Sequence, residues 1–306
     1  MSDQELFGDP ADIRHVIGVA GTFSLHNVSG DVDVRGNDTD EVRVVASSSQ
    51  GNRSQLPLVV RRSEGGLHIQ VEQQSPELFG FKAPRGTGSI DFEVSVPHGA
   101  RVEINGVSSD IEAVGLGGDQ SYRSVSGDID VAGHGGRIVL TTVSGNVELS
   151  ADKPMSADVT STSGDVEIAA PLLTNLQLKT VSGDTQIGAG FAAGPVHSIE
   201  SVSGDLTVRS LTGLTIEFKR AVDMAGGGGR ALVFGDGSAQ LRFRSLSGDV
   251  ELDSGRSTSM AGPAPTQHQS PPPPTEGSLE ILQALERGEI DVDEATRRLE
   301  GASNRG

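Results

Sequence analysis

A row of regularly spaced aspartates is the feature of this sequence with the most capacity for chemistry. Each one follows a Ser-Gly pair, at Asp128, Asp165, Asp184, Asp205 and Asp249. If parallel strands stacked these residues, successive carboxylates would lie about 4.8 Å apart. That distance is short enough for a repulsion that a bound Ca²⁺ would relieve. Ca²⁺ binding by this row is therefore one hypothesis.

Two features of the row favour a structural role instead. Asn146 takes the place of aspartate in one copy, and the copies lack the dense GGxGxD spacing of calcium-binding β-rolls. Short polar side chains in turns commonly bond to nearby backbone groups. We therefore expect the Ser and Asp of each copy to organise a bend, and we expect no cofactor.

The sequence contains no arrangement that is typical of a catalytic centre. Asp128 and Asp130 would share the outward side of a strand, as acids do in β-helical polysaccharide lyases and hydrolases. Sugar clefts usually need stacking aromatic side chains, however, and the repeats offer almost none beyond Tyr122. There is no Cys, the seven His show neither HxH nor HExxH spacing, and Gly226–Gly229 is not followed by Gly-Lys-Ser/Thr. The sequence thus predicts a protein that is not an enzyme.

Charge and hydropathy limit the partners and the location of the chain. The formal net charge is −18, whereas nucleic-acid binding needs clustered Lys and Arg, so we expect no nucleic-acid partner. No run of 18 apolar residues occurs, and the N-terminus lacks the basic start and apolar run of a signal peptide. We expect a cytoplasmic protein without a transmembrane segment, with envelope association as an alternative.

The aspartates belong to a phrase that recurs along the chain. Copies of Val-Ser-Gly-Asp or a close variant begin at Val28, Val125, Val143, Thr162, Val181, Val202 and Leu246. A weaker copy begins at Val107. From Ser109 to Gly204 successive copies lie 18 to 21 residues apart, and Gly248 follows 44 residues after Gly204, which indicates about two further steps. Such a period is typical of one rung of a solenoid.

Alternation within a copy predicts which side chains face the core. Val125, Gly127, Ile129 and Val131 share one side of a strand, which we expect to be the inward side. Upstream of each copy the alternation is out of phase, so we expect a corner or bulge just before Ser-Gly-Asp. The glycine would have positive φ or face a narrow interior. A low aromatic content of 3% fits a thin core of Val, Ile and Leu.

These features predict a mainly β protein, in which residues 1–253 form a parallel β-solenoid with an N-terminal β cap. The expected cap strands are Ile13–Val19, Thr22–His26, Glu41–Ala46, Leu56–Arg61, Leu67–Glu72 and Ile90–Val96. A loop is expected at Pro76–Gly88. Near the other end, Gly235-Asp-Gly237 between two apolar segments predicts a β-hairpin of Arg230–Phe234 with Ser238–Arg244.

The C-terminal part of the chain has a different composition. Residues 254–277 are rich in Pro, Ser, Thr, Gly and Gln, which predicts a flexible linker. Residues 278–301 predict a helical hairpin, with Gly288 after the first helix and a capping box at Asp291 and Glu294. Two helices of about ten residues are marginal alone, so we expect their apolar residues to contact a partner protein, a second copy or the solenoid. These residues are Leu279, Leu282, Leu285, Ile290, Val292 and Leu299.

Residues 12–252 resemble a bacterial adhesin-like family of unknown function. The resemblance rests on the Ser-Gly-Asp copies, on Val96-Pro-His-Gly99 before the first full rungs, and on Phe234-Gly-Asp-Gly237 before the last copy. It implies a β-solenoid and a link to cell-envelope stress or surface attachment. Residues 278–300 resemble the SHOCT-type helical hairpin often attached to this family, which implies oligomerisation.

The leading interpretation is an intracellular scaffold that associates through its hairpin and presents the solenoid face to a protein partner. An exported, adhesin-like surface protein is the first alternative, and a filament former similar to the bactofilins is the second. A filament would require uncapped ends, whereas a surface protein would require export.

Overall fold

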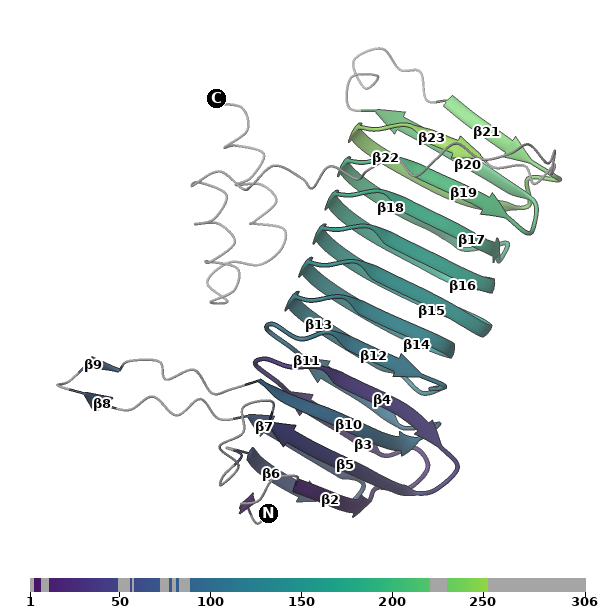
Figure 1. The fold of residues 1–306 in the computed structure, drawn as a ribbon. Coiled ribbons are helices and arrows are strands. Elements are labelled where there is room, and N and C mark those ends of the chain that lie inside the picture. The colour runs from purple at the N-terminus through teal and green to yellow at the C-terminus, as the bar shows by residue number, and fades with distance from the viewer. Residues whose placement is uncertain are drawn as a thin grey trace, which may run out of the picture. The chain divides into compact units, whose positions relative to one another are not determined.

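The computed structural model describes residues 3–6, 11–48, 56, 58–71, 77–78, 81–82, 89–220 and 230–252, all of them within the compact unit Met1–Ser254. These residues form strands and their connections, and no helix that could cross a membrane occurs among them. The strands stack as rungs, and most neighbouring rungs are joined by parallel pairing, as Figure 1 shows. The mainly β, solenoid-like architecture is confirmed.

Each rung of the central array turns at two corners. The strands of this array are β11 (Arg101–Asn105), β12 (Ile111–Val114), β13 (Gln120–Ser126), β14 (Ile129–Ser144), β15 (Val147–Ser163), β16 (Val166–Ser182), β17 (Thr185–Phe191), β18 (Val196–Ser203) and β19 (Leu206–Ser210). β14, β15 and β16 each begin after one copy of Ser-Gly-Asp, or of Ser-Gly-Asn at Ser144–Asn146, and end at the serine of the next copy. We call the bend at Ser-Gly-Asp the motif corner, and the bend in the middle of these strands the opposite corner.

Equivalent residues of successive rungs lie directly opposite one another. After the motif, Ile129 pairs with Val147, and Val147 pairs with Val166. Two residues further along, a second column in the same register is buried: Val131, Leu149, Ile168, Ile187 and Val208. Because side chains alternate across a strand, this register stacks a thin Val, Ile and Leu core along the whole array.

The N-terminal strands cap the first rung by changing to antiparallel pairing. They are β1 (Asp3–Leu6), β2 (Ala11–Val16), β3 (Thr22–His26), β4 (Val32–Asn37), β5 (Glu41–Ser48), β6 (Leu58–Ser63), β7 (Gly66–Val71), β8 (Glu77–Leu78), β9 (Phe81–Lys82) and β10 (Ile90–Pro97). β5 pairs antiparallel with both β2 and β10, and β10 continues in parallel with β4 of the first rung. The expected cap is found. The loop expected at Pro76–Gly88 is wrong in part, because β8 and β9 pair there.

Two expectations for the C-terminal end are wrong. Its strands are β20 (Leu214–Arg220), β21 (Arg230–Phe234), β22 (Ala239–Ser247) and β23 (Val250–Leu252). β21 pairs antiparallel with β20 and not with β22, which instead runs parallel between β18 and β20. β20 therefore lies between β21 and β22. The turn at Gly235-Asp-Gly237 crosses β20 and does not close a β-hairpin. Gly248 lies one rung beyond Gly204, not two, because β19 pairs directly with β23.

Candidate interaction surface

The inward residue at the motif corner is a hydroxyl residue and not the valine that was predicted. Val125 is half-buried, whereas Ser124 before it is buried and in phase with the buried Tyr122. Side chains face the core again at Ile129. The last inward side chain before the corner is therefore Ser124, and the next is Ile129. The alternation changes phase across the four residues Val125 to Asp128, and not at a bulge before Ser126 as expected.

This inward position is a Ser or Thr in six successive copies: Ser124, Thr142, Ser161, Thr180, Ser201 and Ser245. The Thr180 hydroxyl donates a hydrogen bond to the Ser182 carbonyl at 3.3 Å. Four hydroxyls find no hydrogen-bond partner in the described part of the chain, those of Thr142, Ser161, Ser201 and Ser245. Sequence reasoning missed this column, although its signal is plain: in these six copies a Ser or Thr stands two residues before the motif serine.

The motif glycine is required by the neighbouring rung. Gly145 has φ of +133°, and a Cβ at this position would lie 2.2 Å from the carbonyl oxygen of Gly127 in the preceding copy. The same close approach recurs from Gly127 to Gly248. Positive φ and lack of room were both expected. The expectation that Gly faces the interior is wrong, because the room is lacking along the stack of rungs and the glycines are half-buried.

The weak copy at Val107 exchanges two of these positions. Ser109 stands where the other copies have Gly, is buried, and accepts a hydrogen bond at 3.2 Å from the side-chain amide of Asn27. Gly106 stands in the inward position, where a Cβ would lie 3.0 Å from the Ser109 Cβ. In those six copies the inward Ser or Thr fills the space inside the corner. In this copy the inward residue is Gly106, and the side chain of Ser109 fills that space instead.

The motif carboxylates form a ladder of hydrogen bonds along the array. The backbone N–H of Asn146 donates to Asp128 Oδ1 at 2.7 Å, and the N–H of Asp165 donates to Asn146 Oδ1 at 3.0 Å. The same bond recurs at 2.8 to 2.9 Å in the next three copies, Asp184, Asp205 and Asp249. An amide oxygen accepts as a carboxylate oxygen does, so Asn146 continues the row. Each side chain binds the backbone of the next rung, and this holds the bends in register.

Ca²⁺ binding by the row stays a prediction. The backbone bond uses one oxygen of each ladder carboxylate. Within the described ranges, no group of three or more His, Asp or Glu side chains lies close enough together to hold a metal ion. Among the described residues, a cation on the row would therefore meet fewer than three such side chains.

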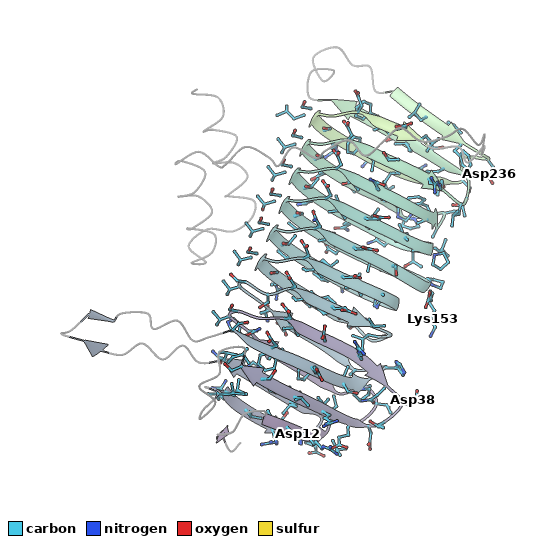
Figure 2. The ribbon with its side chains drawn as sticks, viewed as in Figure 1. Asp12, Asp38, Lys153 and Asp236 are labelled. Carbon is cyan, nitrogen blue, oxygen red and sulfur yellow. The ribbon has the colours of Figure 1, made fainter. Side chains whose placement is uncertain are left out.

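A second row of carboxylates runs beside the ladder on the same exposed side. Glu112 lies opposite Asp130, and Glu148 lies opposite both Asp130 and Glu167. We call the two rows, from Asp110 and Glu112 to Asp165 and Glu167, the acidic face, and Figure 2 shows side chains with oxygen ends along successive rungs. A shallow groove between the rows is lined by Asp31, Asp33, Asp110, Glu112, Asp128 and Asp130. Carboxylates placed opposite one another on neighbouring strands repel.

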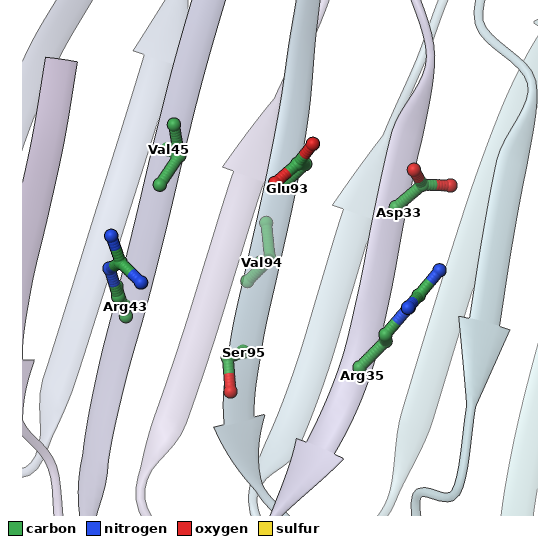
Figure 3. Close-up of a pocket in the computed structure, with 7 residues that line it drawn as sticks. All are labelled: Asp33, Arg35, Arg43, Val45, Glu93, Val94 and Ser95. Atoms are coloured by element: carbon green, nitrogen blue, oxygen red, sulfur yellow. The ribbon is translucent and has the colours of Figure 1, made fainter. Parts of the chain in front are cut away.

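Arginines balance the carboxylates at the N-terminal end of this side. Arg43 of β5 and Arg35 of β4 each lie opposite Ser95 of β10, and Figure 3 shows them in a shallow pocket with Glu93. Arg43 Nη2 donates to Asp12 Oδ2 at 2.9 Å, and this bond lowers the pKa of Asp12. Further along, the second row between Glu112 and Glu167 has no ion pair with any described residue. The acidic face is therefore uncompensated where the rungs are most regular.

The electrostatics of the groove follow from this arrangement. Asp31 lies at its N-terminal end, and its backbone N–H donates to Asp91 Oδ1 at 3.1 Å. Partial burial, and then the nearby charges of Asp91 and Asp110, raise the pKa of Asp31. Ser89-Ile-Asp91 thus acts as a further copy of the ladder position below the first rung, and sequence reasoning missed it because Ile90 replaces the glycine.

Two histidines are buried at the opposite corner. His134 Nδ1 donates to the carbonyl of Leu116 at 3.1 Å and contacts Gln120, whose side-chain oxygen accepts a hydrogen bond from the Tyr122 hydroxyl at 2.7 Å. His197 likewise donates to a backbone carbonyl in its own connection. Burial lowers the pKa of both histidines, so both rings are neutral at neutral pH. They stabilise the fold as buried, hydrogen-bonded rings.

The other predicted contact residues lie outside the described residues. These are Leu279, Leu282, Leu285, Ile290, Val292 and Leu299 of the expected hairpin. The expected linker at 254–277 also lies outside them. The candidate surface described above therefore belongs entirely to the solenoid.

Comparison with known proteins adds one family and several distant structures. The family described as Toastrack DUF4097 matches residues 22–262. A putative adhesin from Bacteroides fragilis is similar over 78% of this chain and 95% of its own, at 9% identity and a TM-score of 0.47. A putative lipid binding protein from Parabacteroides distasonis is similar over 79% of this chain and 97% of its own, at 12% identity and a TM-score of 0.36. No protein in the curated comparison matches. Likenesses at these TM-scores carry no argument about function.

Proposed function

The chain belongs to the Toastrack DUF4097 family, and from that premise we propose that it is a non-enzymatic scaffold whose solenoid binds a protein partner. The observation that carries the proposal is the acidic face. Its carboxylates recur once per rung in a fixed register, and the second row has no ion pair among the described residues. Such a surface suits a partner with basic side chains at matching intervals, because complementary charge steers association and selects register.

The polar groups of the described chain support a non-enzymatic role. The motif aspartates hold the backbone of the next rung, and the Tyr122 hydroxyl is used inside the core. His134 and His197 are buried and donate to backbone carbonyls. These groups are engaged in stabilising the stack, whereas the carboxylates of the second row are exposed and can contact a partner.

Neutralising the second acidic row tests the proposal. The test variant carries Asp130→Asn, Glu148→Gln and Glu167→Gln, and the control removes three exposed charges elsewhere, Asp40→Asn, Glu64→Gln and Asp152→Asn. Each protein is used to recover partners by affinity purification from the native organism. We expect a partner whose binding weakens with salt. The test variant should recover much less of this partner than the wild type, whereas the control should recover the same amount. Equal recovery by both variants would contradict the proposal.

The hairpin adds a second contact in the same proposal. We propose that residues 278–301 mediate self-association or docking through their apolar residues, and that 254–277 serve as a tether. Deleting residues 276–306 is expected to change the oligomeric mass or the partners recovered while the circular dichroism of the β fold is kept. An unchanged mass together with unchanged recovery would remove the hairpin from the proposal.

The alternatives predict different behaviour of the whole protein. We propose a cytoplasmic location, whereas an adhesin-like protein would be found at the cell surface, and fractionation separates the two. A bactofilin-like protein would form filaments that electron microscopy would show, yet the described N-terminal end is closed by antiparallel strands. Ca²⁺ binding by the ladder is tested by calorimetry, in which millimolar Ca²⁺ giving no heat would exclude it.

A further inference from the structure

Two strands at the C-terminal end of the stack have an open edge in the described part of the chain, the three-residue β23 and the longer β21. β21 pairs with β20 through Leu214 and Phe234 at one end and Phe218 and Arg230 at the other. In the described part of the chain, no strand pairs with its second edge. Figure 1 shows β21 as the last strand at this end of the rungs. An open edge presents unpaired backbone N–H and C=O groups to another chain.

Apolar side chains lie on both faces of this edge strand. Leu232 is opposite the buried Ile216, so it belongs to the inward face, yet it is 38% exposed. Val233 points the other way and is 64% exposed. Neither Ala231 nor Phe234 supplies a charge. A second strand that paired with β21 could therefore contact Leu232 on one face of the sheet and Val233 on the other, besides the backbone of the open edge.

The first strand at the other end of the stack is built differently. β2 pairs only with β5 in the described residues, but its sequence holds Asp12, Arg14 and His15. Asp12 accepts hydrogen bonds from both Arg14 and Arg43. Charged side chains on an edge strand oppose pairing with another chain. β21 holds one charged residue, Arg230 at its start, and its other four residues are uncharged, so β21 is less protected against such pairing than β2.

We infer that β21 pairs antiparallel with β21 of a second copy of this chain about a two-fold axis. A two-fold axis at Leu232 places Leu232 opposite its counterpart and Ala231 opposite Val233 of the partner copy, so every central pair is uncharged. Residues directly opposite in an antiparallel pair share a face. The apolar side chains of the two copies therefore meet on the same faces, and a second copy fits this edge better than a charged strand would.

The size and charge of the contact set its strength. A five-residue strand spans about 17 Å, and stable dimers bury about 1,200 Å² or more, so the pairing is weak and reversible. The net charge of −18 on each copy opposes association at long range. Salt screens that repulsion without weakening apolar contact. The dimer should therefore strengthen as salt rises, opposite to the proposed binding of a basic partner by the acidic face.

Sedimentation equilibrium of the full chain tests the inference. The wild type, Val233→Lys and the matched control Val16→Lys, whose valine is 57% exposed on β2, are compared across protein concentration and between 50 and 500 mM salt. We expect the wild type to dimerise more at high salt, Val233→Lys to lose at least tenfold in association, and Val16→Lys to match the wild type. Ala231→Lys repeats the test, and circular dichroism confirms that each variant is folded.

The hairpin is separated by repeating the comparison in a Leu282→Ser, Leu285→Ser background. If association depends on the hairpin alone, the β21 variants will have no effect in either background, and the inference is overturned. A monomeric wild type at all concentrations, or equal loss in Val16→Lys, would overturn it too. If the Leu282→Ser, Leu285→Ser background leaves association unchanged and the β21 variants still reduce it, the hairpin proposal fails and the β21 dimer stands.

Discussion

The motif corner and the opposite corner of the same rungs are built by different means. At the motif corner, serine pairs with serine in register from one rung to the next, as in Ser126 with Ser144 and Ser144 with Ser163. At the opposite corner the pairing of β14 with β15 shifts on both sides of His134, and the pairing of β15 with β16 shifts between Ser150 and Ser156. Differences in rung length are therefore absorbed at one corner only.

This difference explains why only one corner is visible as a motif. At the motif corner, each glycine and each aspartate contacts its own equivalent in the next copy, so a change in one rung must be tolerated by the next. At the opposite corner each rung has its own solution, such as the buried ring of His134 or of His197. Residues that contact their equivalents in the next rung therefore keep the same type from copy to copy. Residues whose contacts lie within one rung can differ between copies.

Gly164→Ala is expected to have the largest effect on the motif corner. The backbone at Gly164 has φ of +119°, and a Cβ would lie 2.2 Å from the Gly145 carbonyl oxygen. We expect the free energy of unfolding to fall by about 3 kcal/mol or more. Gly188→Ala is the control in the next rung, because a Cβ there meets nothing within 4 Å and should change stability by less than about 1 kcal/mol. Similar losses in urea denaturation of both variants would contradict the argument.

The parts of the fold that the sequence predicted are those with a clear alternation or period. Parallel rungs, the thin aliphatic core and the N-terminal cap were all readable, because alternation and period report stacking directly. The pairing of Leu206 with Val250 was not, since 44 residues separate the two copies and local spacing does not reveal an insertion within a rung. The hairpin at Gly235-Asp-Gly237 failed for a similar reason, because β20 is available to pair with β21.

The candidate site was only partly predictable. The aspartate row was recognised, but its bond to the next rung depends on a stacking that no single copy shows. The assumption that an apolar residue marks the inward face placed Val125 in the core, whereas the buried residue is Ser124. The acidic face emerges when Asp130 and Glu148 are brought side by side by the register. Edge exposure at Val233 is a property of the last strand and has no sequence signal of its own.

Acid should weaken the opposite corner more than the motif corner. Burial lowers the pKa of His134 and His197 in the folded state, so below about pH 6.5 the unfolded chain binds protons that the folded chain does not. The stability contributed by the neutral rings is complete above that pH and is lost as the pH falls towards the folded pKa. We expect a loss of up to about 1.4 kcal/mol per pH unit for each histidine.

Urea denaturation between pH 8 and pH 5 measures this effect. His134→Gln and His197→Gln should each flatten the pH dependence relative to the wild type, and pH 8, where both rings are neutral in either state, provides the baseline. A pH dependence that is unchanged by either substitution would show that the buried rings do not control acid sensitivity. The two corners would then not differ in their response to acid.

Asp165 separates the hydrogen bond of the ladder from its charge. Asp165 Oδ1 accepts the backbone N–H of Asp184 at 2.8 Å, as Asn146 Oδ1 does for Asp165. Asp165→Ala removes the acceptor and should cost about 1 to 2 kcal/mol of unfolding free energy. Asp165→Asn keeps the acceptor and relieves repulsion between rungs, so its stability should stay within about 0.5 kcal/mol of the wild type. Thermal denaturation at low and high salt distinguishes them, and equal losses would mean that the charge matters more than the bond.

The smallest effect is expected inside the motif corner, at Thr142. Its buried hydroxyl finds no hydrogen-bond partner among the described residues, whereas the hydroxyl of Thr180, two rungs away, donates to the Ser182 carbonyl. A buried hydroxyl without a partner costs free energy that a methyl group of similar shape does not. Thr142→Val should therefore stabilise the fold by about 0.5 to 1 kcal/mol, and Thr180→Val should be neutral or destabilising. If both lose stability equally in urea, the hydroxyl column contributes to the corner at every rung, and the core there is polar by requirement.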